Sequence, residues 1–128
     1  MRIELPYLPD KKLSPNWQPK SDNTWALRRR EAEQMKSDVM WLCQEYVARK
    51  GATRFETVSV QYIFICNANR RRDPDNWVAR MKSALDGLVQ AGVLKDDSSE
   101  HVTILNPVFK VIPGPWPVTI IEVLEIEG

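Results

Sequence analysis

The chain has 128 residues, of which 43% are hydrophobic and 27% are charged, and its formal net charge at pH 7 is +1. This length and composition predict a single globular domain over residues 1–128. The near-neutral charge excludes nucleic-acid binding through a bulk positive field, so any such binding must rest on local patches.

Membrane and secretory classes are also disfavoured. No apolar run approaches the roughly 20 residues of a membrane span, and the opening MRIELPYLPDKK lacks the basic-then-apolar form of a signal peptide. Cys43 and Cys66 stand singly in apolar settings without a CxxC spacing, which favours two reduced, buried thiols. We therefore expect a cytoplasmic protein with no membrane partner.

The first half of the chain predicts a strand, a loop and a long helix. Residues 2–5 (RIEL) read as a short strand that is closed by prolines. Residues 9–23 are rich in Pro, Asn, Asp, Ser and Lys and predict an exposed loop without regular structure. Thr24 is a good N-cap for a helix over 25–50, and Gly51 supplies its end.

The second half predicts a strand, a helix and two further strands. Residues 55–66 alternate and are rich in β-branched and aromatic side chains, which is typical of a strand. A loop (67–74) follows, and then a helix that begins at Asp75 or Asn76 and ends before Gly92. After a turn (96–100), the next strand (101–111) has an interruption at Asn106-Pro107. A connector (113–117) leads to the last strand (118–127). The order β-α-β-α-β-β predicts an α/β fold with two helices packed on a mixed sheet.

Helical geometry groups several side chains of the second predicted helix. At about 100° per residue, a continuous helix would place Asp75, Lys82 and Asp86 on one stripe. The neighbouring face would bury five apolar side chains against the sheet. They are Val78, Met81, Leu85, Leu88 and Val89. A polar stripe beside a buried face is a place where a cleft could open.

Four aspartates flank this helix and suggest a metal site. Asp73 and Asp75 lie at its start, and Asp96 and Asp97 follow its end. Carboxylates are the ligands that Mg²⁺ or Mn²⁺ prefers, and such an ion stabilises the charge on a phosphoryl group during transfer. Lys82 could neutralise a scissile phosphate.

The basic residues and the aspartates each have an ordinary alternative. Arg70, Arg71 and Arg72, which lead into the helix, could grip flanking phosphates. They could equally be a solvated loop. For the acidic residues the alternatives are a helix N-cap at Asp75, a surface ion pair between Lys82 and Asp86, and a plain turn at 96–99.

Taken together, RRRDPDN, KSALDGL and AGVLKDDS resemble the RusA family of Holliday-junction resolvases, including its phage-encoded relatives. The resemblance implies a homodimeric, Mg²⁺-dependent α/β endonuclease of DNA recombination and repair, which nicks four-way DNA junctions in symmetric pairs. It further implies roles for individual residues. Asp73, Asp75 and Asp97 would bind the metal with Asp96 as an auxiliary, and Lys82 would be the catalytic lysine positioned by Asp86. Asn76 would shape the site. The DNA contacts would be Arg70, Arg71, Arg72, Asn76 and Arg80.

The spacing before Lys82 departs from the family pattern. Lys82 follows Asp75 by seven residues, about two helical turns, whereas the family lysine follows its aspartate by about one turn. Either the helix start is remodelled so that Lys82 still serves, or Arg80 and another base take over. A less selective nuclease of branched DNA, an inactive nucleic-acid-binding module and an ion-stabilised structural protein remain as alternative functions.

Overall fold

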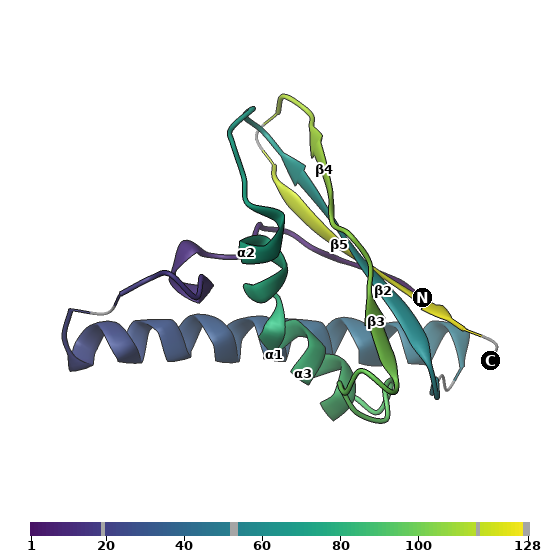
Figure 1. Ribbon diagram of the computed structural model, residues 1–128. Helices are drawn as coiled ribbons and strands as arrows, with labels where there is room; N and C mark the ends of the chain where they lie inside the picture. The colour runs from purple at the N-terminus through teal and green to yellow at the C-terminus, as the bar shows by residue number, and fades with distance from the viewer. Residues whose placement is uncertain (19, 52–53, 115, 127–128) are drawn as a thin grey trace.

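The computed structural model describes residues 1–18, 20–51, 54–114 and 116–126. Its elements follow in the order β1 (Arg2–Leu5), the 3-10 helix η1 (Lys11–Leu13), α1 (Asp22–Lys50), β2 (Val58–Cys66), α2 (Pro74–Ala79), α3 (Lys82–Gln90), β3 (Val102–Ile104), β4 (Val108–Val111) and β5 (Val118–Glu125). The fold is mixed α/β, as predicted (Figure 1). Positions 19 and 115 of the predicted loops, and the end of the last predicted strand at 127, lie outside the described residues.

The strands form one five-stranded mixed sheet with the order β1-β5-β2-β3, and β4 also pairs with β2. β5 lies between β1 and β2 and is antiparallel to both. β3 and β4 pair with β2 in succession, and both run parallel to it. The interruption predicted at Asn106-Pro107 therefore separates two strands along a single edge of the sheet.

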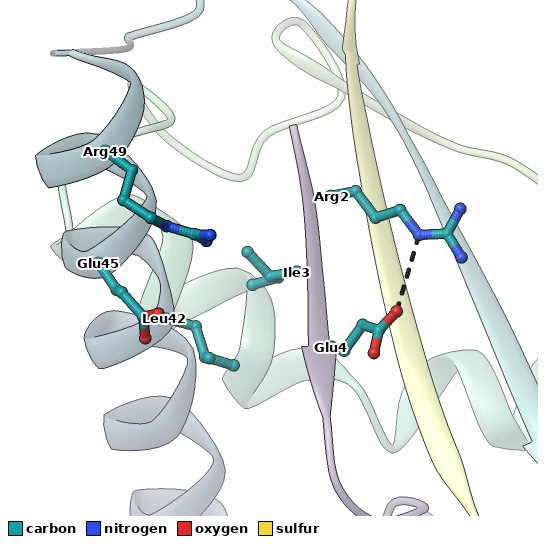
Figure 2. A pocket seen from close by; sticks show the side chains of 6 residues that line it. All are labelled: Arg2, Ile3, Glu4, Leu42, Glu45 and Arg49. Carbon is teal, nitrogen blue, oxygen red and sulfur yellow. Dashed lines mark ion pairs between the residues drawn. The ribbon is translucent and has the colours of Figure 1, made fainter.

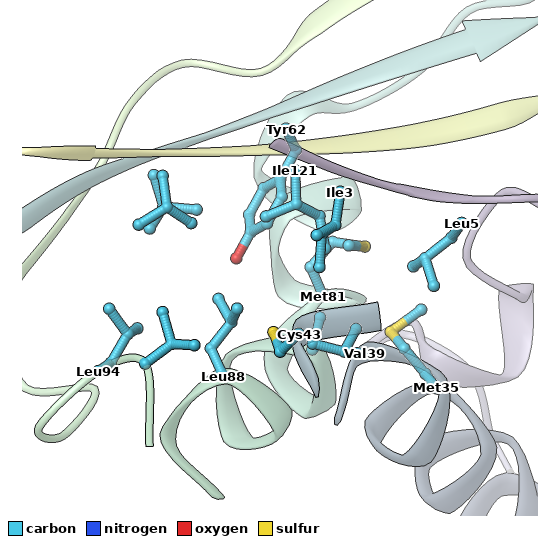
Figure 3. Packing of buried hydrophobic residues seen from close by; sticks show 14 of the residues in the cluster. Ile3, Leu5, Met35, Val39, Cys43, Tyr62, Met81, Leu88, Leu94 and Ile121 are labelled. Carbon is cyan, nitrogen blue, oxygen red and sulfur yellow. The ribbon is translucent and has the colours of Figure 1, made fainter. Parts of the chain in front are cut away.

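The core lies between one face of the sheet and the helices. Figure 3 shows the strands on one side of the packed side chains and the helices on the other. Alternate residues of β2 are buried, from Val58 through Tyr62 to Cys66, because successive side chains of a strand point to opposite faces. Cys43 and Cys66 are buried and unpaired, as predicted. None of the helices in the described part of the chain has an apolar stretch long enough to cross a lipid bilayer.

The start of α1 differs from the prediction by a few residues. Its N-cap is Ser21, and the predicted cap Thr24 instead accepts a hydrogen bond at Oγ1 from the Ser21 N–H at 3.0 Å. The helix ends at Gly51, whose φ of 91° is costly for residues with a side chain. The end was predicted correctly because the chemistry of a glycine stop is local.

The segment 9–23 is not uniformly exposed, and the prediction of a loop without regular structure is wrong there. Asp10 caps η1 by accepting a hydrogen bond from the Lys12 N–H at 2.8 Å. Leu13 is buried in the core cluster, and Ser14 beside it is buried too. Burial of Leu13 and Ser14 anchors this largely polar segment on the body of the protein.

The second predicted helix is broken in two, so the prediction of one continuous helix is wrong. Met81 has φ −91° and ψ 8°, and its N–H bonds to Val78 three residues back at 3.0 Å. The two halves have different packing partners. In α2, Trp77 packs on Phe64 of β2, whereas α3 contacts α1 closely at Gly87.

The predicted buried face survives the break. Met81 and Leu88 are fully buried, and the other three predicted side chains are partly buried against the core cluster. They are Val78, Leu85 and Val89. The predicted stripe of Asp75, Lys82 and Asp86 does not survive, because Asp75 is in α2 while Lys82 and Asp86 are in α3.

Candidate functional site

Four arginines surround a hollow between the end of β2 and helix α2. The hollow has a volume of about 350 Å³ and also has Leu8, Asn67, Ala68 and Trp77 in its wall. The arginines are Arg70, Arg71, Arg72 and Arg80. We call it the arginine hollow. Three of these arginines come from the loop that follows β2, and Arg80 follows the last turn of α2.

Backbone carbonyl groups hold two of the guanidinium groups in place. Arg72 donates to the carbonyl oxygens of Arg70 and Ala68, both at 2.9 Å. Arg80 donates from Nε to Asn76 Oδ1 at 3.0 Å and from a terminal nitrogen to the Pro9 carbonyl oxygen at 3.3 Å. Donors with fixed positions lose little freedom when an anion binds to them.

The side chain of Trp77 forms the support for these cations. The guanidinium carbon of Arg80 lies 4.6 Å from the Trp77 ring centre, and that of Arg72 lies 5.6 Å from it. The indole in turn packs edge-on against Phe64 and Phe109, with ring centres 5.1 and 5.6 Å away. Cation–π contacts with a ring that is anchored on two strands therefore fix the wall of the hollow.

The positive charge of the arginine hollow is not neutralised by ion pairs. Within the described ranges, none of its four arginines lies within ion-pair distance of a carboxylate. Burial lowers the pKa of the Arg80 guanidinium, and the charge of Asp10 opposes that change. Arginine stays protonated in proteins, so the hollow can attract an anion such as phosphate.

The carboxylate of Asp73 caps the start of α2. Asp73, rather than Asp75, is the N-cap, and its Oδ1 accepts from the Asp75 N–H at 3.1 Å. Pro74 occupies the first helical position, where the missing N–H has no cost. Asn76 donates from Nδ2 to Ser14 Oγ at 2.6 Å, which ties α2 to the segment after η1. Asp73 and Asp75 are exposed on this short helix.

A second group of charged residues forms at the start of α3. The Lys82 ammonium group donates to Asp97 and lies 3.3 Å from Asp86 Oδ1. The hydrogen bond to Asp97, and then the bond to Asp86, raise the pKa of Lys82. The lysine side chain is 64% exposed, so solvent screens the pair. Asp86 and Asp97 also border a hollow of about 390 Å³ with Lys36.

Asp96 has a separate role in the turn after α3. Its Oδ1 accepts from the Ser98 N–H at 2.8 Å, and Oδ2 lies 3.6 Å from His101 Nε2. Hydrogen bonds from Ser98 lower the pKa of this carboxyl group. The turn that these contacts stabilise presents Asp97 to Lys82.

The structure thus separates the predicted site residues. The four arginines line one hollow with Trp77, and Lys82 pairs with Asp86 and Asp97. Asp73 and Asp75 lie at the start of α2, and Asp96 lies in the turn with Ser98. Among the described residues, no three His, Cys, Asp or Glu side chains lie together in a group that could hold a metal ion. Asp97 is bound to Lys82, and Asp73 Oδ1 accepts from the Asp75 N–H, so these two carboxylates lie in separate local arrangements.

Sequence reasoning missed Trp77 and Lys36. The signal for Trp77 was present, because an aromatic residue between Arg72 and Arg80, next to Asp75 and Asn76, is a suitable cation–π partner. Lys36 gave no signal, since only the packing of α1 on α3 brings it near Asp97.

Neither a protein-family model nor a curated protein sequence matches the chain.

Proposed function

We propose that the protein binds the phosphate backbone of branched DNA through the arginine hollow and acts as an endonuclease on four-way junctions. The observation that supports the binding is the hollow itself, which four arginines line together with Trp77. In the part of the chain that the structure describes, none of the four forms an ion pair with a carboxylate, and Arg72 and Arg80 lie over the Trp77 ring. Guanidinium groups bind phosphate with paired, charge-assisted hydrogen bonds. A local patch of this kind is what a chain with a net charge of +1 requires for contact with DNA.

The hollow favours recognition by shape. Its donors are arginine side chains, and phosphate contacts set the position of a protein on DNA without carrying sequence information. Arg72 and Arg80 are held by carbonyl groups, whereas Arg70 and Arg71 are exposed at the rim. We therefore expect preference for a DNA shape that brings several phosphates to one point, as a junction does.

The cleavage activity is supported by the motif resemblance. Lys82 forms ion pairs with Asp86 and Asp97. The contact with Asp86 is consistent with the implied role of Asp86 in positioning the lysine. The Mg²⁺ requirement and the homodimer belong to the same resemblance. Asp73, Asp75 and Asp97 do not form one group among the described residues, so the Mg²⁺ requirement is supported by the resemblance alone.

A second candidate function is binding of junction DNA without cleavage. The Lys82–Asp97 ion pair favours it, because it engages two of the residues that cleavage would use. The two functions share the arginine hollow and differ only in whether product forms.

One experiment separates these functions. Binding of a labelled four-way junction and of a duplex of equal length is measured by fluorescence anisotropy over a range of salt concentrations, and cleavage is followed on gels with and without MgCl₂. Arg80→Gln should weaken junction binding about tenfold, or ~1.4 kcal/mol, and reduce the salt slope by about 1. The matched control is Arg54→Gln, since Arg54 is exposed and lies away from the hollow.

The outcomes are distinct. Junction cleavage that needs Mg²⁺ and is lost in Asp75→Asn supports the endonuclease. Equal cleavage of junction and duplex leaves a less selective nuclease. Junction binding with no product at any metal concentration supports the binding module. Absence of binding, or an equal effect of Arg54→Gln and Arg80→Gln, overturns the role of the arginine hollow.

A further inference from the structure

Three apolar side chains are exposed at the end of the sheet where the chain turns from β4 to β5. They belong to Val111, Ile112 and Trp116, and we call them the apolar tip. Trp116 is 81% exposed, more than any other large apolar residue in the described part of the chain. Single apolar residues are common on protein surfaces, whereas a group of them marks a surface that binds a partner.

The apolar tip lies beside the loop that carries three of the arginines. Val111 pairs with Cys66 at the end of β2, and the Ile112 N–H donates to the Cys66 carbonyl oxygen at 2.9 Å. The next residue of that loop, Asn67, is already in the wall of the arginine hollow. Figure 1 shows the turn after β4 and the loop after β2 at the same end of the sheet. The apolar tip and the arginine hollow are therefore neighbouring surfaces.

The apolar tip has side chains on both faces of the sheet. Val111 lies two residues beyond Phe109 and shares its face, on which Phe109 packs against Trp77. Ile112 is the next residue and lies on the opposite face by the alternation of a strand. Trp116 lies just before β5, which begins at the same end of the sheet. An exposed apolar group with two faces at the end of a sheet has the shape of a wedge.

The sequence around the apolar tip is basic. Residues 106–118 contain Lys110 and no Asp or Glu, and residues 67–72 contain three arginines and no acidic residue. This surface thus combines apolar side chains with positive charge. DNA has the complementary combination, because each base is attached to a charged backbone. Proteins that bind unpaired bases likewise combine basic residues with side chains on which the bases stack.

The surface around Trp41 in the second half of α1 differs in its charge. Trp41 is 70% exposed and borders a hollow with Leu42 and Glu45. Leu42 and Glu45 also line the neighbouring hollow of Figure 2, where Arg2 Nε lies 4.0 Å from Glu4 Oε1. Two arginines and two glutamates balance there. This exposed tryptophan therefore lacks the positive surroundings of the apolar tip and serves as its matched control.

We infer that the apolar tip inserts between base pairs at the branch point of a DNA junction and stacks on the bases that it separates. The inference rests on the proposed function, since the arginine hollow must hold the adjacent phosphates. Apolar side chains that enter a base step unstack it, and this is least costly where a base has already lost a neighbour. Pro113 and Pro117 restrict the backbone of the turn, so little freedom is lost on binding.

The test measures junction affinity together with the oxidation of thymines by permanganate, which attacks thymines that have lost their stacking. MgCl₂ is left out so that the junction stays intact. The unaltered chain should raise the reactivity of thymines at the branch point and leave those in the arms unchanged. Trp116→Ala should remove most of this increase and weaken junction binding about tenfold. The salt slope should stay the same, because no phosphate contact is lost.

Further variants assign the effect to the apolar tip. Trp116→Phe keeps an aromatic ring and should behave as the unaltered chain does. Ile112→Ser, at a second exposed position, should also reduce the thymine reactivity, and Trp41→Ala should change neither measurement. Circular dichroism should be the same for all of them, since the altered side chains are exposed. Arg80→Gln should lower the salt slope and, at saturating protein, leave the thymine reactivity intact.

The outcomes separate this inference from the proposed function. Junction binding that depends on Arg80 but gives no thymine reactivity, or that Trp116→Ala and Ile112→Ser leave unchanged, overturns the role of the apolar tip and retains the arginine hollow. An equal loss in Trp41→Ala and Trp116→Ala also overturns the role of the apolar tip. Absence of junction binding by the unaltered chain overturns the proposed function and the inference with it.

Discussion

Gly87 is the point where α3 comes closest to α1, and Gly87→Ala tests that approach. A Cβ atom at this position would lie 2.8 Å from the Lys36 carbonyl oxygen and 3.0 and 3.1 Å from Cβ and Cγ1 of Val39. The oxygen belongs to the backbone in the middle of α1 and cannot rotate away as a flexible side chain could. The two helices must therefore separate or shift to admit one methyl group.

Two opposing terms set the size of the effect. Alanine is a better helix former than glycine by about 0.8–1.0 kcal/mol, whereas overpacking a well-packed interface costs about 1–3 kcal/mol. The obstacle is rigid backbone, which places the steric cost in the upper half of that range. We expect a net loss of about 1–2 kcal/mol in the free energy of unfolding, and a larger loss for Gly87→Val.

The assay is urea denaturation followed by circular dichroism, in which the midpoint should fall while the slope stays constant. Gly114→Ala is the matched control, because a Cβ there meets nothing within 4 Å. It should be neutral or slightly stabilising, since it restricts the unfolded chain. A Gly87→Ala protein that is as stable as the unaltered chain would refute the close packing of α3 on α1.

Two further predictions concern titratable groups. Burial raises the pKa of the Cys43 thiol to about 11 and also raises the pKa of the Cys66 thiol. Neither thiol should therefore react with a disulfide reagent at pH 8 until urea unfolds the chain. Rapid labelling of the folded protein would contradict this. The pKa of Lys82 is raised in the folded state by Asp97 and Asp86, so its stabilisation is complete below the unfolded pKa of about 10.4 and is lost as pH rises through the folded value. The pair is largely exposed, so Lys82→Met should lower the free energy of unfolding by only about 0.2–1 kcal/mol at neutral pH. This difference between the variant and the unaltered chain should shrink at alkaline pH. A difference that does not change with pH would contradict the ion pair.

The strands and the end of α1 could be predicted because their signals are local. Side chains along β2 alternate between buried and partly exposed positions, which indicates a strand regardless of the strand it pairs with. Gly51 ends α1 through its own backbone conformation. The fold of η1 could not be predicted in the same way. It depends on Leu13, which reaches the core only because α1 and the sheet lie there to receive it.

The candidate site was predictable in its parts and not in its assembly. The sequence placed Arg80 with Arg70, Arg71 and Arg72 among the DNA contacts, but it gave no sign that Arg72 and Arg80 would both lie over the ring of Trp77. That contact requires α2 to pack on Phe109 of β4, which follows it by some thirty residues in the chain. Side chains that meet through distant packing leave no periodic signal.

The break at Met81 gives a physical meaning to the long spacing before Lys82. In one straight helix, Lys82 would lie about two turns from Asp75 on the same stripe. In the structure, α2 ends at Ala79, Met81 turns its buried side chain into the core, and Lys82 becomes the first residue of α3. The position of the Lys82 side chain is therefore set by α3 and not by α2. Asp86 lies one turn further on that helix, and the turn after it brings Asp97 to the same ammonium group.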